Sequence, residues 1–320
     1  MKAVILDYQT LAPNDLALDT LWQQAIDWQL YDTTPADQTA ERIKDMDIVL
    51  TNKVVLDEAL LNANPNIRLI IILATGTNNV DLQAARKLGI PVCNIVAYST
   101  ESVVQHTFAC LLSLVNRLRD YDRALAEKRW QNGALFTLLD YPVEELAGKT
   151  MGIIGYGAIG KRVADVAIAF GMQVVVAQSL TGANKQQQER LPLPQLLQQA
   201  DVISLHCPLS PLSENLIDAK ALAMMKTDAI VLNMARGGVV HEQALLQALL
   251  NGQIRAAACD VLTQEPPPAD HILLQQDMPN LLITPHMAWG SRQARQQLLD
   301  QVLDILQSFA DNRLINRVNN

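Results

Sequence analysis

Cysteine is scarce in this sequence, and the four that occur are scattered. Cys93, Cys110, Cys207 and Cys259 form no CxxC pair, and the one histidine beside any of them is His206. A disulfide framework or a zinc site would need closer spacing of its ligands. We therefore expect no metal site, and we interpret the four cysteines as small core residues in a reducing compartment.

Long apolar runs and basic runs are also missing. The longest unbroken aliphatic run, residues 69–74, is far shorter than the roughly 18 apolar residues that a membrane span needs. Asp7 interrupts the first apolar stretch after four residues, which is too short for a signal peptide. With 25 Lys and Arg against 33 Asp and Glu, the net charge is −8. This disfavours binding to nucleic acid or to an anionic membrane, and we expect a soluble cytoplasmic protein.

What the chain does contain is a regular alternation of short aliphatic runs and longer helical patterns. Its 320 residues exceed what one hydrophobic core usually fills, so two domains are expected. The alternation predicts α/β domains with parallel sheets. A first series of strands is predicted at residues 3–6, 48–51 and 69–73. A second series, long enough for a complete dinucleotide-binding sheet, is predicted at 151–154, 173–177, 202–205, 230–233, 256–259 and 281–284.

Two helices and one irregular segment complete the predicted organisation. A long helix is expected over residues 101–120, between the two series of strands, and an amphipathic helix over 291–312. The segment 121–148 has weak periodicity but carries Trp130, Phe136 and Tyr141. Three aromatic side chains in such a segment indicate burial against another surface, and we expect that surface to be a second subunit.

A glycine-rich motif follows the first strand of the second series. Gly155, Gly157 and Gly160 form G-x-G-x-x-G between an apolar strand and an apolar-periodic helix. In a dinucleotide-binding turn one glycine makes the tight turn, one lets the backbone reach the pyrophosphate, and one lets the helix pack on the strand. The acidic residue that usually binds the ribose is expected about 20 residues further on, but the second strand ends in Gln178.

Five histidines occur, and their positions relative to the strand ends distinguish them. Ligands of open α/β sheets bind outside the carboxyl ends of the strands, so reactive residues should follow those ends. His286 ends the run LLITPH and is the best placed general acid. His206 also ends a strand and could flank a ligand. His106 is interpreted as a packed helix residue, and His241 and His271 as helix-end or solvated residues.

Arg236 and Glu265 occupy corresponding positions after two other strands. Arg236 follows AIVLNMA and precedes two glycines, and its guanidinium can hold a carboxylate by two hydrogen bonds. Glu265 follows AAACDVL in a turn closed by three prolines. Each alone is typical of an exposed strand-end residue. Together with His286 they predict an acid–base site, in which Glu265 keeps the imidazole charged and Arg236 binds an anionic substrate.

These motifs, in this order, resemble those of the NAD(P)-dependent D-2-hydroxyacid dehydrogenases over essentially the whole chain. Within that family they are most similar to the glycerate dehydrogenase (hydroxypyruvate reductase) branch. The matching segments are ATGTNNVDLQAARKLGIPVCN, SVVQHT, LLDYPVEELAGKTMGIIGYG, GYGAIG, HCPLSPLSENLI, NMARGGVVHEQAL, ACDVLTQEPP and PHMAWGSRQAR.

The resemblance implies roles for individual residues. The implied catalytic residues are Arg236, Glu265 and His286. The implied substrate contacts are Lys53, Thr75, Gly76, Arg236 and His286. The implied cofactor contacts are Thr107, Gly155, Gly157, Ala158, Ile159, Gly160, Gln178, His206, Met234, Ala235, Asp260, His286 and Ala288, with Asp260 at the nicotinamide half.

The resemblance also implies an architecture and a reaction. It implies two Rossmann/flavodoxin-like, doubly wound parallel-sheet domains with the active site in the cleft between them. Residues 1–100 and 287–320 would bind the substrate, residues 101–286 would bind the dinucleotide, and 121–148 would be the arm of a homodimer. The implied reaction is hydride transfer between NAD(P)H and a small 2-keto acid such as hydroxypyruvate or glyoxylate.

Several alternatives stay open at this point. A corepressor-like module that senses NAD is the alternative from a different functional class, and another 2-hydroxyacid specificity is the alternative within the family. Formate dehydrogenases carry Gln at the position of Glu265, which argues against that activity. Gln178 has no charge to reject a 2′-phosphate, and Lys185 is the nearest cation along the chain. We therefore expect both cofactors to be accepted, with NADH modestly ahead.

Overall fold

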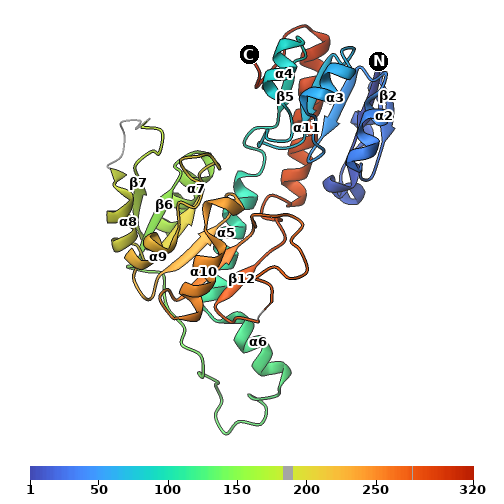
Figure 1. Cartoon of the computed structure of the whole chain (residues 1–320). Coiled ribbons are helices and arrows are strands. Elements are labelled where there is room, and N and C mark those ends of the chain that lie inside the picture. Colours follow the sequence, from blue (N-terminus) through green and yellow to red (C-terminus); the bar gives the residue numbers. More distant parts are fainter. Residues whose placement is uncertain (183–189, 276) are drawn as a thin grey trace. The chain divides into compact units, whose positions relative to one another are not determined.

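The chain forms two compact units, each with its own parallel sheet and flanking helices (Figure 1). The computed structural model describes residues 1–182, 190–275 and 277–320. One unit consists of Met1–Ser99 and Gly290–Asn320, and the other consists of Thr100–Trp289. The two α/β folds predicted from the sequence are confirmed.

The first unit contains a five-stranded sheet with the order β2-β1-β3-β4-β5. Its strands are β1 (Lys2–Ile5), β2 (Asp27–Leu30), β3 (Ile48–Thr51), β4 (Leu69–Ile72) and β5 (Val92–Asn94). Its helices are α1 (Asp19–Trp22), α2 (Thr39–Ile43), α3 (Glu58–Ala63), α4 (Leu82–Lys87) and α11 (Arg292–Ala310), with 3-10 helices η1 (Tyr8–Leu11), η2 (Pro13–Asp15) and η3 (Ala36–Gln38). Every residue of β3 and β4 is buried, as expected for central strands covered on both faces.

The C-terminal helix α11 belongs to this first unit, although its sequence lies far from the rest of the unit. Ser291 caps the helix, since its hydroxyl accepts the N–H of Ala294 at 3.2 Å. Leu298, Val302 and Ile305 are buried along one stripe. The amphipathic helix predicted over 291–312 is therefore confirmed, within one or two residues at each end.

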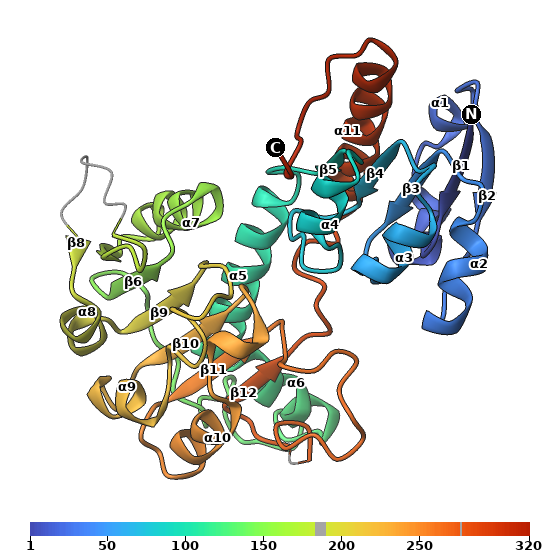
Figure 2. The same ribbon diagram turned by 45° about the horizontal axis from the view of Figure 1, so that its top comes forward.

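The second unit contains a seven-stranded sheet with the order β12-β11-β10-β9-β6-β7-β8 (Figure 2). Its strands are β6 (Thr150–Ile154), β7 (Gln173–Ala177), β8 (Arg190–Leu191), β9 (Val202–Leu205), β10 (Ile230–Asn233), β11 (Ala256–Cys259) and β12 (Leu281–Ile283). From β6 the chain winds outward through β7 and β8, then returns to β9 and winds the other way. The direction reverses between β6 and β9, and ligands of such sheets bind beside this point.

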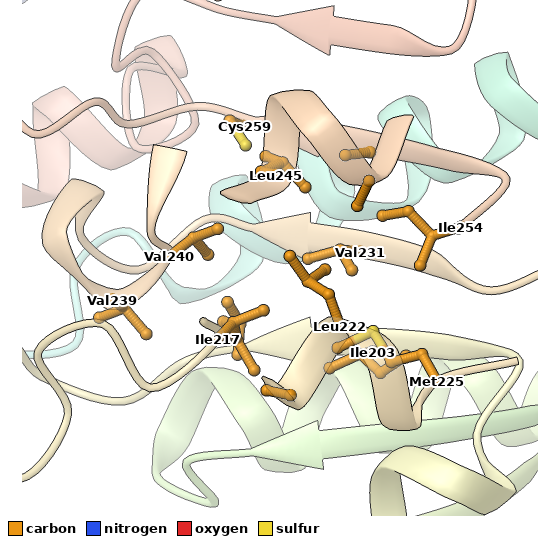
Figure 3. Close-up of a cluster of buried hydrophobic side chains, with 14 of the residues drawn as sticks. Ile203, Ile217, Leu222, Met225, Val231, Val239, Val240, Leu245, Ile254 and Cys259 are labelled. Carbon is orange, nitrogen blue, oxygen red and sulfur yellow. The ribbon is translucent and has the colours of Figure 1, made fainter. Parts of the chain in front are cut away.

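Helices cover both faces of this second sheet. They are α5 (Thr100–Val115), α6 (Leu118–Ala126), α7 (Ala158–Ala169), α8 (Leu193–Gln199), α9 (Ala219–Met224) and α10 (Glu242–Leu250), with the 3-10 helix η4 (Gly237–Val239). Side chains of α5 and α7 pack on one face with Met151 and Ile153 of β6. On the other face α8, α9 and α10 enclose a second apolar cluster, where Leu222 and Met225 lie near Ile203 and Val231 (Figure 3).

The long helix predicted over residues 101–120 is wrong in one respect, because the structure has two helices there. Arg117 lies between α5 and α6 with φ +55°, in the left-handed region. The Asn116 side-chain amide donates to the carbonyl oxygen of Leu112 at 3.0 Å, which satisfies an acceptor in the last turn of α5. Arg117 then pairs with Asp120 at 2.6 Å. These local contacts end one helix and start the next without interrupting the apolar pattern.

The segment between α6 and β6, all of it described, contains no helix or strand and extends away from the sheet of its unit (green in Figure 1). Several of its large apolar side chains are exposed: Phe136 is 91% exposed, Leu139 77% and Leu135 72%. Trp130 is also exposed. Single exposed apolar residues are ordinary, but several gathered in one segment indicate a surface that binds another one.

The four cysteines are buried and none forms a disulfide. Burial raises the pKa of Cys93 to about 11 and that of Cys259 to about 12, so these side chains stay neutral thiols. Among the described residues no group of three His, Cys, Asp or Glu side chains could hold a metal ion. No helix within the described ranges has both the length and the apolar character needed to cross a membrane.

Candidate active site

The turn after β12 holds a histidine and a carboxylate in direct contact. His286 follows Pro285 and has φ +52°, and its backbone N–H donates to the carbonyl oxygen of Asp260 at 2.7 Å. The Nδ1 atom of His286 lies 2.5 Å from Oε2 of Glu265. The two side chains are 25% and 33% exposed, so the pair is sheltered and still open to a small molecule. The pairing predicted from the sequence is therefore present.

Both oxygens of the Glu265 carboxylate are engaged. Oε2 contacts His286, and Oε1 accepts the backbone N–H of Leu262 at 2.9 Å. A carboxylate held in this way keeps the proton of the imidazole on Nδ1, which leaves Nε2 for a reacting group. Such an arrangement suits a general acid that gives up and regains a proton at Nε2.

Asp260 fixes the turn that carries His286. Its side chain is 2% exposed, and its two oxygens accept three hydrogen bonds. Oδ1 accepts the hydroxyl of Thr284 at 2.6 Å and the N–H of Met287 at 2.9 Å, and Oδ2 accepts the N–H of Ala288 at 2.9 Å. The sequence predicted that Asp260 contacts a cofactor. In the structure its carboxylate joins the end of β11 to both sides of His286.

His106 contributes to the same network from helix α5. Its Nε2 atom lies 2.9 Å from the hydroxyl of Thr284 and 3.6 Å from Oδ1 of Asp260. Ser102, one turn earlier in α5, donates its hydroxyl to the carbonyl oxygen of Ala288 at 2.7 Å. The interpretation of His106 as a packed, hydrogen-bonded helix residue is confirmed, and its partners lie beside the catalytic candidate.

Arg236 lies at the carboxyl end of β10, in a loop that packs closely on the loop of Glu265. A Cβ atom on the adjacent Gly237 would lie 2.0 Å from the backbone of Leu262, so only glycine allows this approach. The partly buried Arg236 donates through Nη1 to the carbonyl oxygen of Ala235 at 2.7 Å. The amide of Asn233 donates to the carbonyl oxygen of Arg236 at 2.9 Å, which holds the turn.

His271 differs from its prediction as a solvated or helix-end residue. It is buried, and its Nε2 atom lies 3.2 Å from Oε2 of Glu242, at the start of α10. The other oxygen of Glu242 accepts the N–H of Thr263 at 2.7 Å. The two side chains thereby support the loop that carries Glu265. His241 is a helix-end residue as predicted, since its Nδ1 accepts the N–H of Ala244 at 3.1 Å.

The glycine-rich turn after β6 has the geometry that a dinucleotide needs. Gly155 has φ +95°, and a Cβ atom there would lie 2.5 Å from the backbone of His206 and Cys207. A Cβ atom on Gly160 would lie 2.1 Å from the carbonyl oxygen of Gly155, so the helix packs directly on the turn. A Cβ atom on Gly157 would meet no atom within 4 Å. The backbone at the start of α7 is therefore open to a ligand.

His206, opposite this turn, has an unused polar atom. Its Nε2 atom lies 2.8 Å from the hydroxyl of Ser204, whereas its buried Nδ1 has no hydrogen-bond partner among the described residues. Burial lowers the pKa of His206 to about 4, so the ring is neutral near pH 7. An unpaired buried nitrogen beside an open phosphate-binding turn fits a bound dinucleotide.

The remaining cofactor residues implied by the resemblance lie around the same sheet. Thr107 is buried in α5 and donates its hydroxyl to the carbonyl oxygen of Val103 at 2.7 Å. Ala158 is exposed at the start of α7, next to the partly buried Ile159. Met234 and Ala235 are buried after β10, and Ala288 is buried after β12. Gln178 is exposed at the end of β7.

The implied substrate contacts Lys53, Thr75 and Gly76 belong to the first unit. They follow the adjacent strands β3 and β4. The hydroxyl of Thr75 donates to the carbonyl oxygen of Ile95 at 2.8 Å, and its own carbonyl oxygen accepts the amide of Asn94 at 2.8 Å. Lys53 is exposed.

Sequence reasoning missed the residue that orders the Lys53 turn. Asp7, at the end of β1, is buried and accepts the backbone N–H groups of Asn52, Lys53 and Val54 at 2.6–3.3 Å. Burial raises its pKa, and these hydrogen bonds oppose that rise. The one signal in the sequence was an acidic residue directly after an apolar strand.

Comparisons with known proteins agree with this site. A profile described as "D-isomer specific 2-hydroxyacid dehydrogenase, NAD binding domain" matches residues 108–288. A hydroxypyruvate reductase of Blautia hydrogenotrophica is 38% identical over 324 residues, covering 100% of both chains. A glycerate dehydrogenase of Methylorubrum extorquens is 40% identical over 284 residues, covering 88% of this chain and 89% of its own.

The fold comparison finds solved structures of enzymes that hold nicotinamide nucleotides. The solved structure of an acyclic imino acid reductase in complex with NADPH and D-Arg matches with a TM-score of 0.87 and 25% identity, covering 99% of this chain and 100% of that one. The open glycine-rich turn and the contact between Glu265 and His286 are compatible with a nicotinamide-dependent reaction. The chain therefore belongs to the D-isomer specific 2-hydroxyacid dehydrogenase family and is an NAD(P)-dependent enzyme of that family.

Proposed function

We propose that this dehydrogenase reduces hydroxypyruvate to D-glycerate and, with the same machinery, glyoxylate to glycolate. The observation that carries the proposal is the contact of 2.5 Å between His286 and Glu265, which suits proton donation to a keto oxygen. The choice of substrate is supported by relatives at 38% and 40% identity that are named hydroxypyruvate reductase and glycerate dehydrogenase.

The roles of the residues follow from their chemistry. When bound, the nicotinamide cofactor supplies a hydride to the keto carbon of the substrate. His286 donates the proton on Nε2 to the keto oxygen, so that a hydroxyl forms and the imidazole becomes neutral. Glu265 orients the ring through Nδ1 and stabilises its charged form. Arg236 binds the substrate carboxylate through two parallel hydrogen bonds.

Further contacts are assigned as part of this proposal. Lys53, Thr75 and Gly76 contact the substrate. Gly155, Gly157 and Gly160, with the start of α7, bind the pyrophosphate. The other cofactor contacts are Thr107, Ala158, Ile159, Gln178, His206, Met234, Ala235 and Ala288, while Asp260 acts by holding the turn of His286.

A panel of 2-keto acids tests the substrate. Purified protein is assayed with hydroxypyruvate, glyoxylate, pyruvate and phenylpyruvate, each with NADH and with NADPH, and kcat/KM is compared. The proposal expects hydroxypyruvate or glyoxylate to exceed pyruvate by at least about tenfold. A preference for a bulky or branched keto acid would overturn the substrate choice and leave the family unchanged.

The exposed segment 127–149 suggests how the enzyme assembles. We infer that it binds a second copy of the chain, because Leu135, Phe136 and Leu139 are largely exposed to solvent. Sedimentation of the wild type and of a Phe136→Ser, Leu139→Ser variant tests this inference. We expect a dimer for the wild type and a larger monomer fraction for the variant. A monomeric wild type at micromolar concentration would contradict the inference.

A further inference from the structure

Arg190 lies at the edge of the second sheet, near the end of β7, although it is separated from β7 along the chain. The short strand β8 pairs with β7, with Arg190 opposite Val176 and Leu191 opposite Ala177. Leu191 and Ala177 join the apolar cluster on the side of α8, α9 and α10. Neighbouring residues of a strand face opposite sides, so Arg190 lies on the face covered by α7.

The guanidinium of Arg190 lies beside the glycine-rich turn. Its Cζ atom is 5.9 Å from the ring centroid of Tyr156, which stands between Gly155 and Gly157. Its Nε atom is buried and has no hydrogen-bond partner in the described part of the chain. A buried charged donor without a hydrogen-bond partner lowers the stability of the fold. A ligand that supplies an acceptor to this Nε atom would therefore bind favourably.

The position of Gln178 indicates which group of the ligand would accept a hydrogen bond from Arg190. Its backbone N–H donates to the carbonyl oxygen of Leu191 at 2.9 Å, so the ends of β7 and β8 are tied together. In this fold the side chain at the end of the second strand meets the adenosine ribose, and a carboxylate there excludes a 2′-phosphate. Gln178 is uncharged, and Arg190 is on the neighbouring strand. Lys185, the nearest cation considered from the sequence, lies outside the described residues.

We propose that Arg190 binds the 2′-phosphate of NADP(H) and makes NADPH at least as good a ligand as NADH. This inference rests on the proposed nicotinamide-dependent function and adds the residue that selects the cofactor. Arginine suits the task because its planar fork forms two charge-assisted hydrogen bonds with phosphate. It differs from the expectation of a modest NADH preference, which considered only the cations that follow the second strand along the chain.

Equilibrium binding of the two nucleotides tests the proposal without any substrate. Dissociation constants of NADPH and NADH are measured by nucleotide fluorescence for the wild type, Arg190→Ala and Arg190→Lys. Loss of a charged hydrogen bond predicts a rise of about 10- to 100-fold in the NADPH constant for Arg190→Ala, with less than about threefold for NADH. Arg190→Lys keeps the positive charge but loses the planar guanidinium. Its dissociation constant for NADPH should therefore lie between those of the wild type and of Arg190→Ala. Unchanged NADH binding also shows that each variant is folded.

A matched control distinguishes a direct contact with the 2′-phosphate from a general effect of positive charge. Arg162→Ala removes one positive charge from α7, where Arg162 pairs with Glu101, and should leave the ratio of the two constants unchanged. Competition by 2′,5′-ADP and by 5′-AMP measures the contribution of the 2′-phosphate to binding. In the wild type 2′,5′-ADP should bind more tightly than 5′-AMP, and Arg190→Ala should remove this difference.

The outcomes that overturn the inference are distinct from those that overturn the function. Equal weakening of both nucleotides by Arg190→Ala, or no weakening of NADPH, would refute the role of Arg190. A wild type that binds NADH at least tenfold more tightly than NADPH would also refute it. A wild type that binds nucleotides as proposed but reduces neither hydroxypyruvate nor glyoxylate would leave this inference standing and refute the proposed substrate.

Discussion

The hydrogen bond between Glu265 and His286 determines how the rate of the reaction should respond when the carboxylate is removed. Glu265→Gln preserves the size of the side chain but has one acceptor oxygen in place of two. In the wild type one carboxylate oxygen accepts a hydrogen bond from Nδ1 of His286 and the other accepts one from the N–H of Leu262. The single oxygen of the amide can replace only one of these two acceptors. The variant therefore loses charge and one hydrogen bond together.

The size of the effect follows from the kind of bond. A hydrogen bond to a charged group contributes about 1.5–3 kcal/mol, and a neutral one about 0.5–1.5 kcal/mol. Because both side chains are a quarter to a third exposed, the lower part of each range applies. At these lower ends the two ranges differ by about 1 kcal/mol, which corresponds to about fivefold in rate.

The loss should fall on both reaction directions. The same carboxylate orients His286 whether the ring donates a proton during reduction or accepts one during oxidation. We therefore expect kcat/KM for the keto acid and for the hydroxy acid each to fall about fivefold or more, while the dissociation constant of NADH stays the same.

The assay is kcat/KM for the keto acid and for the hydroxy acid, with the dissociation constant of NADH measured beside it. Glu101→Gln, which makes the same change at an exposed ion pair on α5, is the matched control and should not lower either value. If Glu265→Gln left both values unchanged, the carboxylate would not orient the imidazole and the assigned roles would be wrong.

Three further predictions concern the same site. His286→Gln should lower turnover about 10²- to 10⁴-fold while the dissociation constant of NADH stays the same; turnover near that of the wild type would exclude His286 as the proton donor. Arg236→Lys should raise KM for the keto acid much more than KM for the nucleotide, and equal effects would place Arg236 away from the substrate. Asp260→Ala removes three hydrogen bonds from the turn of His286 and should cost about 3 kcal/mol in urea unfolding. It should also lower kcat more than it weakens NADH binding, whereas a selective loss of NADH affinity would identify Asp260 as a cofactor contact instead.

The sequence alone determined the parts of this protein that depend on local pattern and on sheet topology. Parallel strands covered on both faces are largely apolar, so β3, β4 and β10 stand out as runs of three or four aliphatic residues. The carboxyl ends of parallel strands lie at one edge, so Arg236, Glu265 and His286 could be grouped before any contact was known. The glycine spacing predicted the phosphate-binding turn, because only glycine fits at Gly155 and Gly160.

Some features escaped because their local signal is weak. The strand β2 reads DWQL, with only two apolar residues, and β8 has two residues in all. The break between α5 and α6 leaves the apolar period intact, and it is made by the side chains of Asn116 and Arg117. Short or irregular segments such as these take their conformation from the neighbours they pair with.

Only the tertiary structure showed which polar residues hold the site in place. Asp7 contacts a turn 45 residues away, and Asp260 contacts one 24 to 28 residues away. Arg190 meets Tyr156 through the pairing of β8 with β7. A buried carboxylate or guanidinium takes its role from the donors and acceptors that folding brings to it, and their separation along the chain carries no periodic signal.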